Sequence, residues 1–391
     1  MIFCIKMKLF SIFVPMNYKL KVVVRQLSSF GVGRGRMILF YFVFCLLVSC
    51  KKQDNSGFEA ITIDVSKDMS VPISEIADDI IKIELETTDD CLLNEIRQVE
   101  VFEGYLLVKD RSLRLYVFDM QGNFVRSIGQ GGNGPGEYSF CSGFTLDYQN
   151  KKIFLRTNIG IMTYDIEGNF LHKYPLEAHM DIFYNNSFFY TRSNKFESDD
   201  QNQYNDIYIS KFDNNMNVVD SLRMFRDITP IGNIRFSSVF KPIFQRGEDI
   251  CVYFPRPSDE LKRIKDTLYI IDDFYLRPLL SVQLTNSSYE EERIAKIFTT
   301  ERYVLVNYQT YVGELRSPNR KMYGSQCIYD RRSKKAKYAK DGFVNDVYNG
   351  GRVIISPMDE QSMFYYTEEN EYSDELRAEP NPTVYIGTFK K

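Results

Sequence analysis

Short apolar segments alternate with turn residues along most of the chain. Segments 114–129 (RLYVFDMQGNFVRSIG) and 160–176 (GIMTYDIEGNFLHKYPL) share one pattern: a strand-like run, an aspartate, two residues, Gly-Asn, and a second strand-like run. A Gly-Asn pair between two such runs is typical of a β-hairpin turn. Weaker copies occupy 207–224, 267–282 and 326–340. The pattern therefore predicts a series of related hairpins.

The hairpins recur at a regular distance. The aspartates at their turns are 46 to 59 residues apart: Asp119, Asp165, Asp213, Asp272 and Asp330. Another strand precedes each hairpin, and a sixth unit follows, with its strands at 351–356, 363–368 and 383–389. A repeat of this length with four short strands is the signature of a β-propeller. We therefore predict an all-β fold: a six-bladed β-propeller with four-stranded blades.

Two further segments complete this prediction. In 80–87 (IIKIELET), apolar and charged residues alternate, which is typical of a half-buried strand. This early strand is expected to pair into the last blade and so to close the ring. In 287–301, the spacing of Ile294, Ile297 and Phe298 predicts a helix inserted in the fifth blade.

The N-terminal region has the character of an export signal. The apolar run Met37–Val48 has twelve residues, fewer than the roughly 20 that a membrane span needs, and it suits a signal-peptide core. The following Leu-Val-Ser-Cys resembles the lipobox of bacterial lipoproteins, which implies that Cys50 is lipidated. An ordinary signal peptide and a membrane anchor are the alternatives.

This interpretation divides the chain into three parts. Residues 1–49 form the leader, whose start is either assigned too early or extended by a long basic region. Residues 50–70 hold the lipidated cysteine and a tether, and residues 71–391 form the propeller. The expected location is the cell envelope, as an outer-membrane lipoprotein that faces the periplasm or the surface.

Charge and composition exclude several functions. A chain that starts at Cys50 has 42 basic and 52 acidic residues, so it has no electrostatic reason to bind nucleic acid. Neither the two histidines, His172 and His179, nor the dispersed cysteines suggest a metal or redox site. We expect no metal and no cofactor.

The stretch 129–134 (GQGGNG) satisfies the dinucleotide fingerprint G-x-G-x-x-G. That fingerprint works only when its last glycine opens a helix that receives the pyrophosphate. Here Pro135-Gly136 and a strand-like sequence follow. The stretch therefore predicts a turn between the first and second blades.

Several pieces in order resemble a known family: 83–96 (IELETTDDCLLNEI), the GNGPGEY loop, 266–272 (DTLYIID) and 342–351 (GFVNDVYNGG). The repeats look like NHL-type propeller repeats. The whole is similar to six-bladed β-propeller lipoproteins of gut-type Gram-negative bacteria. The resemblance implies the fold and the lipid anchor, and it brings no catalytic residues.

Basic residues mark a candidate binding site. Four arginines stand at or just after a strand end in consecutive units: Arg111, Arg156, Arg192 and Arg256. We expect these strands to be the inner strands of their blades, so that their ends converge on one mouth of the channel, where guanidinium groups would bind a carboxylate, sulfate or phosphate. The alternative is that they are solvated loop residues. Asn345 and Asp346 either contact a ligand or cap a bend.

These features favour a binding module over an enzyme. The expected ligand is an acidic glycan or another anion, bound at one face of the channel. The alternatives are a polysaccharide lyase or glycosidase acting at the channel mouth, and a non-catalytic scaffold for an outer-membrane protein partner. We expect a monomer that contacts the membrane through its lipid anchor only.

Overall fold

The computed structural model describes most of the chain after residue 57. The chain divides into two units, Met1–Gly57 and Phe58–Lys391, and the described residues all belong to the second. They are 58–111, 114–175, 179–230, 243–254, 265–272, 275–287, 291–312, 321–348, 350–358, 362–368 and 380–391. The predicted leader and Cys50 lie outside the described residues.

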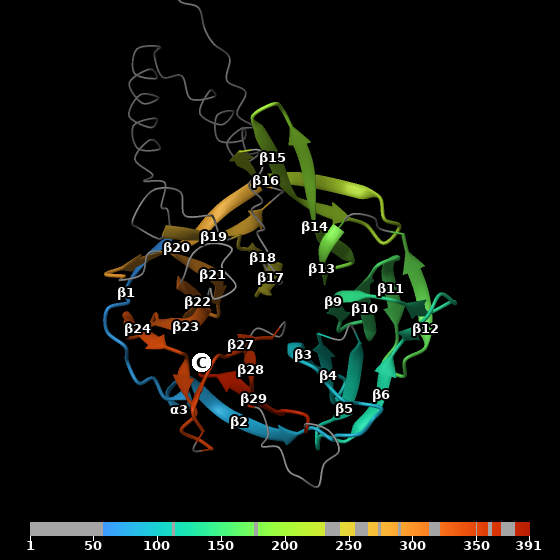
Figure 1. The fold of residues 1–391 in the computed structure, drawn as a ribbon, viewed down its shortest axis with the longest axis horizontal. Coiled ribbons are helices and arrows are strands. Elements are labelled where there is room, and N and C mark those ends of the chain that lie inside the picture. The colour runs from blue at the N-terminus through green and yellow to red at the C-terminus, as the bar shows by residue number, and fades with distance from the viewer. Residues whose placement is uncertain are drawn as a thin grey trace, which may run out of the picture. The chain divides into compact units, whose positions relative to one another are not determined.

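Six sheets of at least four strands form a ring, so the predicted six-bladed β-propeller is confirmed (Figure 1). From the axis outward, blade 1 contains β3 (Ile96–Phe102), β4 (Tyr105–Asp110), β5 (Leu115–Asp119) and β6 (Phe124–Ile128). Blade 2 contains β9 (Cys141–Asp147), β10 (Lys152–Thr157), β11 (Gly160–Tyr164) and β12 (Phe170–Tyr174). Blade 3 contains β13 (His179–Asn185), β14 (Phe188–Ser198), β15 (Asn202–Phe212) and β16 (Val218–Pro230).

The second half of the ring follows the same order. Blade 4 contains β17 (Ile243–Arg246), β18 (Asp249–Val252), β19 (Lys265–Asp272) and β20 (Tyr275–Thr285). Blade 5 contains β21 (Glu291–Thr299), β22 (Tyr303–Val312), β23 (Lys321–Asp330) and β24 (Lys335–Lys340). Blade 6 contains β27 (Ser356–Pro357), β28 (Met363–Glu368), β29 (Thr383–Phe389) and β2 (Ala77–Glu84).

The ring closes as the sequence predicts. Strand β2 pairs antiparallel with β29, so the early chain supplies the outermost strand of blade 6. The predicted alternation holds only in part: Ile83 and Leu85 are buried, whereas Ile81, which was expected on the same face, is exposed. Closure of this kind joins the two ends of the propeller chain within one blade, because β2 covers the outer edge of β29.

The chain before β2 runs along the outside of blades 4 and 5. Strand β1 (Glu59–Asp64) pairs parallel with β20 as a fifth strand of blade 4. It lies within 50–70, the segment for which the sequence predicts a tether. Further on, Met69 N donates to Tyr338 O of β24 at 2.8 Å, and the short helix α3 (Ile73–Ile76) leads into β2.

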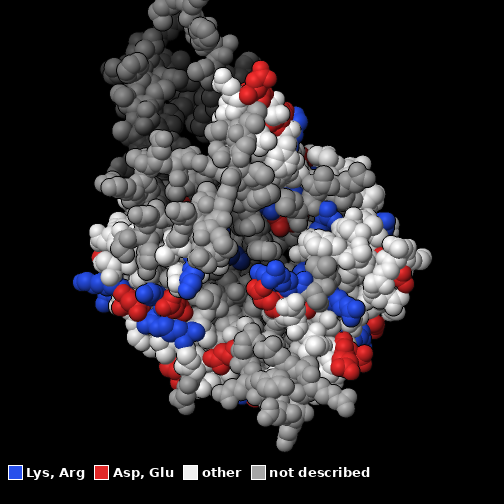
Figure 2. Space-filling view, in the orientation of Figure 1, with Lys and Arg blue, Asp and Glu red and all other residues white. Residues whose placement is uncertain are grey.

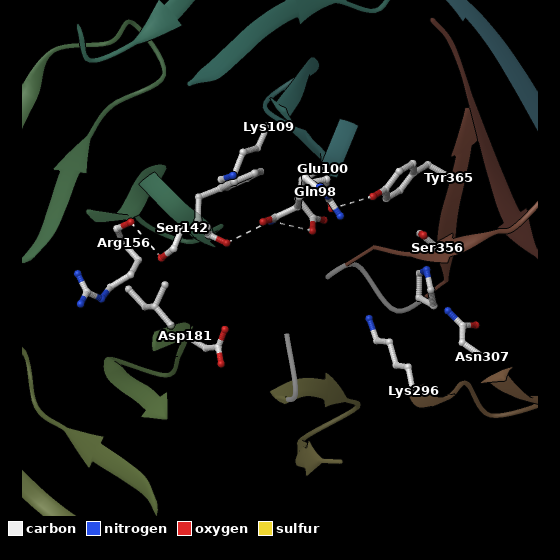
Figure 3. A pocket seen from close by; sticks show the side chains of 15 residues that line it. Gln98, Glu100, Lys109, Ser142, Arg156, Asp181, Lys296, Asn307, Ser356 and Tyr365 are labelled. Atoms are coloured by element: carbon white, nitrogen blue, oxygen red, sulfur yellow. Dashed lines mark hydrogen bonds between the residues drawn. The ribbon is translucent and has the colours of Figure 1, made fainter. Parts of the chain in front are cut away.

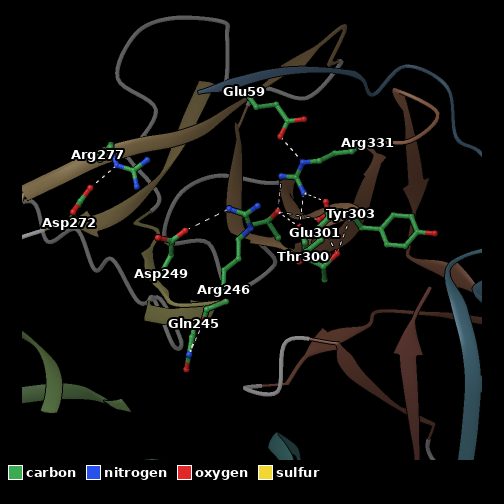
Figure 4. A network of polar contacts seen from close by, with 12 residues as sticks. Glu59, Gln245, Arg246, Asp249, Asp272, Arg277, Thr300, Glu301, Tyr303 and Arg331 are labelled. Atoms are coloured by element: carbon green, nitrogen blue, oxygen red, sulfur yellow. Dashed lines mark hydrogen bonds and ion pairs between the residues drawn. The ribbon is translucent and has the colours of Figure 1, made fainter. Parts of the chain in front are cut away.

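Arg331 joins this outer segment to blade 5 (Figure 4). Its Nε donates to Glu59 Oε2 at 2.8 Å, and its Nη1 donates to Thr300 O at 2.6 Å. Its Nη2 donates to Thr299 Oγ1 at 2.8 Å. One guanidinium therefore fastens β1 to the turn that connects β21 and β22.

The hydrophobic core lies between neighbouring blades. On β4, Leu107 packs with Phe144 of blade 2, whereas Leu106 and Val108 pack with Val384 of blade 6. Successive side chains of a strand point to opposite faces. Because both faces are covered, β4 is an almost continuous apolar run in sequence.

The helix predicted over 287–301 is wrong, because 291–299 forms the innermost strand of blade 5. The pairing register shifts between Ile294 and Lys296, which marks a β-bulge. The extra residue places Ile294 and Ile297 three positions apart, and both are fully buried. The bulge thus produced the helix-like spacing. Within the described residues, no helix has the length and apolar character to cross a membrane.

The glycine-rich stretch 129–134 is a turn, as the sequence predicts. It contributes β7 (Gln130–Gly131), which pairs parallel with β8 (Glu137–Tyr138) between blades 1 and 2. The Glu137 carboxylate accepts hydrogen bonds from Gly134 N and Gln130 Nε2, both at 2.8 Å. The loop therefore binds a side chain of its own chain.

The predicted strand over 351–356 is divided between two sheets. Strand β26 (Arg352–Val353) pairs with β25 (Phe343–Val344) in a small separate ladder. Only β27 belongs to blade 6, of which it is the innermost strand.

Candidate functional site

A cavity of about 210 Å³ lies at the centre of the ring (Figure 3). Its described lining comes from the two innermost strands of blades 1, 2, 5 and 6 and from β13 of blade 3. Most of the lining residues have polar side chains, although Phe144, Ile182 and Pro357 also contribute to the lining. Five blades thus bring residues distant in sequence to one site.

A shared irregularity positions many of these side chains. In four blades, the described pairing between the innermost and second strands is shifted by one residue. Such bulges commonly redirect side chains. The residues that face each other beside the bulges are Gln98 and Lys109, Gly143 and Arg156, Asp181 and Arg192, and Lys296 and Asn307.

This register reveals a recurrence of cations. Lys109, Arg156 and Arg192 occupy equivalent positions on the second strands of blades 1, 2 and 3. Blade 5 has Asn307 there, and its cation, Lys296, stands on the innermost strand instead. The cavity therefore has basic groups on several of its walls.

Lys109 is deeply buried, with 5% of its surface exposed. Its Nζ donates to Asp110 O at 3.1 Å. Burial lowers the pKa of Lys109, because the charged ammonium loses hydration. The nearby Cys141 thiol stays neutral at physiological pH, since burial raises its pKa to about 11.

Arg156 is half-buried beside Lys109. Its guanidinium donates to Thr157 O, and its own carbonyl accepts from Ser142 Oγ at 3.3 Å. Burial lowers the pKa of Arg156, but a guanidinium keeps its charge in proteins. Arg156 can therefore offer a permanent charge and planar donors to an anion.

In blade 3, Arg192 is separated from the cavity by the Asp181 carboxylate. Arg192 Nε lies 2.6 Å from Asp181 Oδ2, and Asp181 is the residue that lines the cavity. Burial raises the pKa of Asp181, an effect that Arg192 and then Arg156 oppose. A second carboxylate, Glu100, has 1% of its surface exposed, and Gln98 Nε2 donates to it at 3.4 Å.

Positive charge is in excess at this site. The described lining contains four cationic side chains (Arg97, Lys109, Arg156 and Lys296) and two carboxylates (Glu100 and Asp181). Figure 2 shows basic side chains around the central hollow of the face in view. Among the described residues, no cluster of His, Cys, Asp and Glu could hold a metal ion.

The sequence-predicted arginines lie in different places. Arg156 lines the cavity, and Arg192 reaches it only through Asp181. The Arg111 side chain is 68% exposed, lies 3.5 Å from Glu95 and does not line the cavity. In blade 1, the position equivalent to Arg156 and Arg192 is occupied by Lys109, two residues before Arg111. Arg256 lies outside the described residues.

The expectation that these arginines follow inner strands is also corrected. The segments at 105–110, 152–157 and 187–192 belong to β4, β10 and β14, which are the second strands from the axis. Lys109 of β4 and Arg156 of β10 still line the cavity, beside the bulges of β3 and β9, whereas the described residues of β14 do not line it.

Asn345 and Asp346 lie elsewhere. Asn345 is fully buried, and its Nδ2 donates to Glu368 Oε1 at 2.8 Å. Asp346 accepts from Ser74 N at 3.0 Å and thereby fastens helix α3 to the loop before β26. Neither residue lines the cavity.

Several cavity residues were missed in the sequence. They are polar residues inside apolar strands: Gln98, Glu100, Lys109, Asp181, Lys296 and Asn307. A polar residue that interrupts an apolar strand was the signal in the sequence that could have identified these cavity residues. It could be interpreted only once the innermost strand of each blade was known.

One solved structure shares the fold, and others show a weaker likeness. A "Putative exported protein" of Bacteroides fragilis NCTC 9343 aligns over 85% of this chain and 100% of its own, with 17% identity and a TM-score of 0.57. The RRP9 WD40 repeats align over 83% of this chain and 100% of theirs, with 10% identity and a TM-score of 0.44. BamB from Moraxella catarrhalis aligns over 73% and 75%, with 11% identity and a TM-score of 0.36.

No curated protein matches the chain. A family model does match it, over residues 59–386, which is nearly the whole described propeller. The chain therefore belongs to the family described as Domain of unknown function (DUF4934).

Proposed function

We propose that this protein is a lipid-anchored cell-envelope protein that binds a small anionic ligand in the cavity at the axis of its propeller. The excess of cationic over anionic side chains in that cavity is the observation that carries the proposal. The predicted lipidation of Cys50 and the exported relative of the same fold support the location.

The environment of Lys109 and Arg156 favours anion binding. Removing a cation from water costs free energy, which a bound anion offsets through charge-assisted hydrogen bonds. Both side chains are held on strands of a closed ring, so little conformational entropy is lost when a ligand binds. A rigid cationic cavity is therefore suited to selective recognition.

The cavity volume limits the size of the ligand. About 210 Å³ is less than the roughly 300–1,000 Å³ of pockets that hold drug-sized ligands. A single sugar acid, or the terminal residue of an acidic glycan, suits this space better than an internal stretch of polysaccharide.

The direct test is calorimetric titration with galacturonate, and with uncharged galactose as the matched ligand. Galacturonate should bind and galactose should not. Lys109→Met retains side-chain length and removes the charge, so it should weaken galacturonate binding about tenfold or more. Lys151→Met is the control, because Lys151 is exposed and pairs with Glu103 at 2.6 Å, away from the cavity.

Two results would contradict the proposal: equal binding of galactose and galacturonate, or no binding by a panel of sugar acids, sulfate and phosphate. Release of an unsaturated or hydrolysed product would instead support the lyase or glycosidase alternative. The anchor has a separate test, since Cys50→Ala should abolish incorporation of labelled palmitate.

A further inference from the structure

The cations of the cavity stand on opposite walls. Arg156 belongs to blade 2 and Lys296 to blade 5, which are three positions apart in a ring of six. Lys109 of blade 1 lies on the same side as Arg156, and Figure 3 shows Lys296 across the cavity from both.

We infer that the ligand carries two anionic groups, one held by Lys109 and Arg156 and the other by Lys296 on the opposite wall. This inference rests on the proposed function and names the ligand class for the same site. A single carboxylate would contact only one of the two walls.

The other polar groups that line the cavity indicate what joins the anionic groups. Ser142, Asn307 and Tyr365 offer hydroxyl and amide groups to the cavity. Glu100 and Asp181 can accept hydrogen bonds from ligand hydroxyls, whereas they would repel a third anionic group. The fitting class is a compact, hydroxylated diacid, such as a sugar oxidised to a carboxylate at both ends.

A series of six-carbon probes separates this inference from the proposed function. Galactarate has two carboxylates, galacturonate has one and galactitol has none, while the three differ little in size. Titrations belong at low ionic strength, because screening weakens charge discrimination. We expect galactarate to bind about tenfold more tightly than galacturonate and galactitol to show no binding.

Variants of Lys296 test the second contact. Lys296→Gln should lower galactarate affinity about tenfold, to the level of galacturonate, while galacturonate affinity stays within about twofold. Lys296→Arg retains the charge and should retain the preference for galactarate. Lys151→Gln, on the exposed lysine outside the cavity, is the matched control and should change neither affinity.

The outcomes are distinct. If galactarate binds no more tightly than galacturonate, the two-anion inference is overturned while the proposed function stands. If Lys296→Gln weakens both acids equally, Lys296 makes no specific contact with a second anionic group, and the inference also fails. If neither acid binds, the inference and the proposed function both fail for sugar acids.

Discussion

Arg192 Nε lies 2.6 Å from Asp181 Oδ2, and these two residues also face each other in the ladder between β14 and β13. The pair stands at the register that Lys109 and Arg156 occupy in the preceding blades. One repeated pair of facing positions therefore supplies a cation to the cavity in blades 1 and 2, and in blade 3 it supplies a carboxylate that is paired with a cation. These facing residues of blades 1 to 3 occupy equivalent positions of the structural repeat and differ in residue type.

Breaking this pair should destabilise the protein. Arg192→Met leaves the buried Asp181 carboxylate without its closest cation, which should cost about 3–5 kcal/mol of unfolding free energy. Denaturant unfolding measures the change. Arg111→Met is the control, because its exposed pair with Glu95 should contribute less than about 1 kcal/mol.

A double-mutant cycle tests whether the two residues act as a pair. Asp181→Leu combined with Arg192→Met should cost less than the sum of the single changes, with a coupling of roughly 1–3 kcal/mol. Strictly additive losses would contradict the pairing.

The turns that revealed the repeat also support the closure of the ring. In blade 1, Gly122 has a φ of +91°, and a Cβ there would stand 2.0 Å from the Glu84 carbonyl oxygen of β2. Gly122→Ala should therefore cost about 3 kcal/mol or more of unfolding free energy. Gly104→Ala has a similar φ of +79° and open space, so it should cost only about 1–2 kcal/mol. Equal losses in thermal or denaturant unfolding would contradict the role of this contact.

The fold was predictable because its signals are local and repeated. Asp119 and Asn123 form the turn of blade 1, and Asp213 and Asn217 make the same side-chain hydrogen bond in blade 3. There Met216 takes the left-handed position with a φ of +62°, so the turn persists although its sequence signal is weak.

The cavity was harder to predict, because its residues meet only through the long-range order of the blades. The sequence prediction considered only arginines and therefore named Arg111 in blade 1. The bulge in β3 instead places Lys109 at the position that Arg156 occupies in blade 2. A one-residue bulge is not visible in the hydrophobic pattern of a strand that is buried on both faces. A bulge of the same kind in β21 produced the spacing of apolar residues that led to the incorrect helix prediction.

The planar guanidinium of Arg331 should contribute to stability in a way that a lysine side chain cannot replace. Its guanidinium donates to four different groups, on β1 and at the end of β21 and the turn after it, and a lysine cannot reproduce this fork. Arg331→Lys should lower the unfolding free energy by about 1–3 kcal/mol. The neighbouring Arg332 is exposed, so Arg332→Lys should be neutral. Unchanged unfolding of both variants would mean that β1 is held by its pairing with β20 alone.

Lys109 should make stability and binding respond to pH in opposite directions. Burial lowers its folded-state pKa below the ordinary 10.5, so between these two values the unfolded chain binds more protons than the folded one. The stability contributed by this group therefore rises with pH across that interval. Anion affinity should fall over the same interval, because the neutral amine no longer attracts a carboxylate.

Comparison with Lys109→Met isolates this effect from the other titrating groups. Galacturonate affinity and the thermal midpoint are measured from about pH 7 to about pH 10. The native protein should lose affinity as pH rises, whereas Lys109→Met should bind weakly and with little pH dependence. Lys109→Arg keeps its charge throughout this range, so its affinity should stay constant. An alkaline loss of affinity that persists in Lys109→Arg would assign the titration to another group.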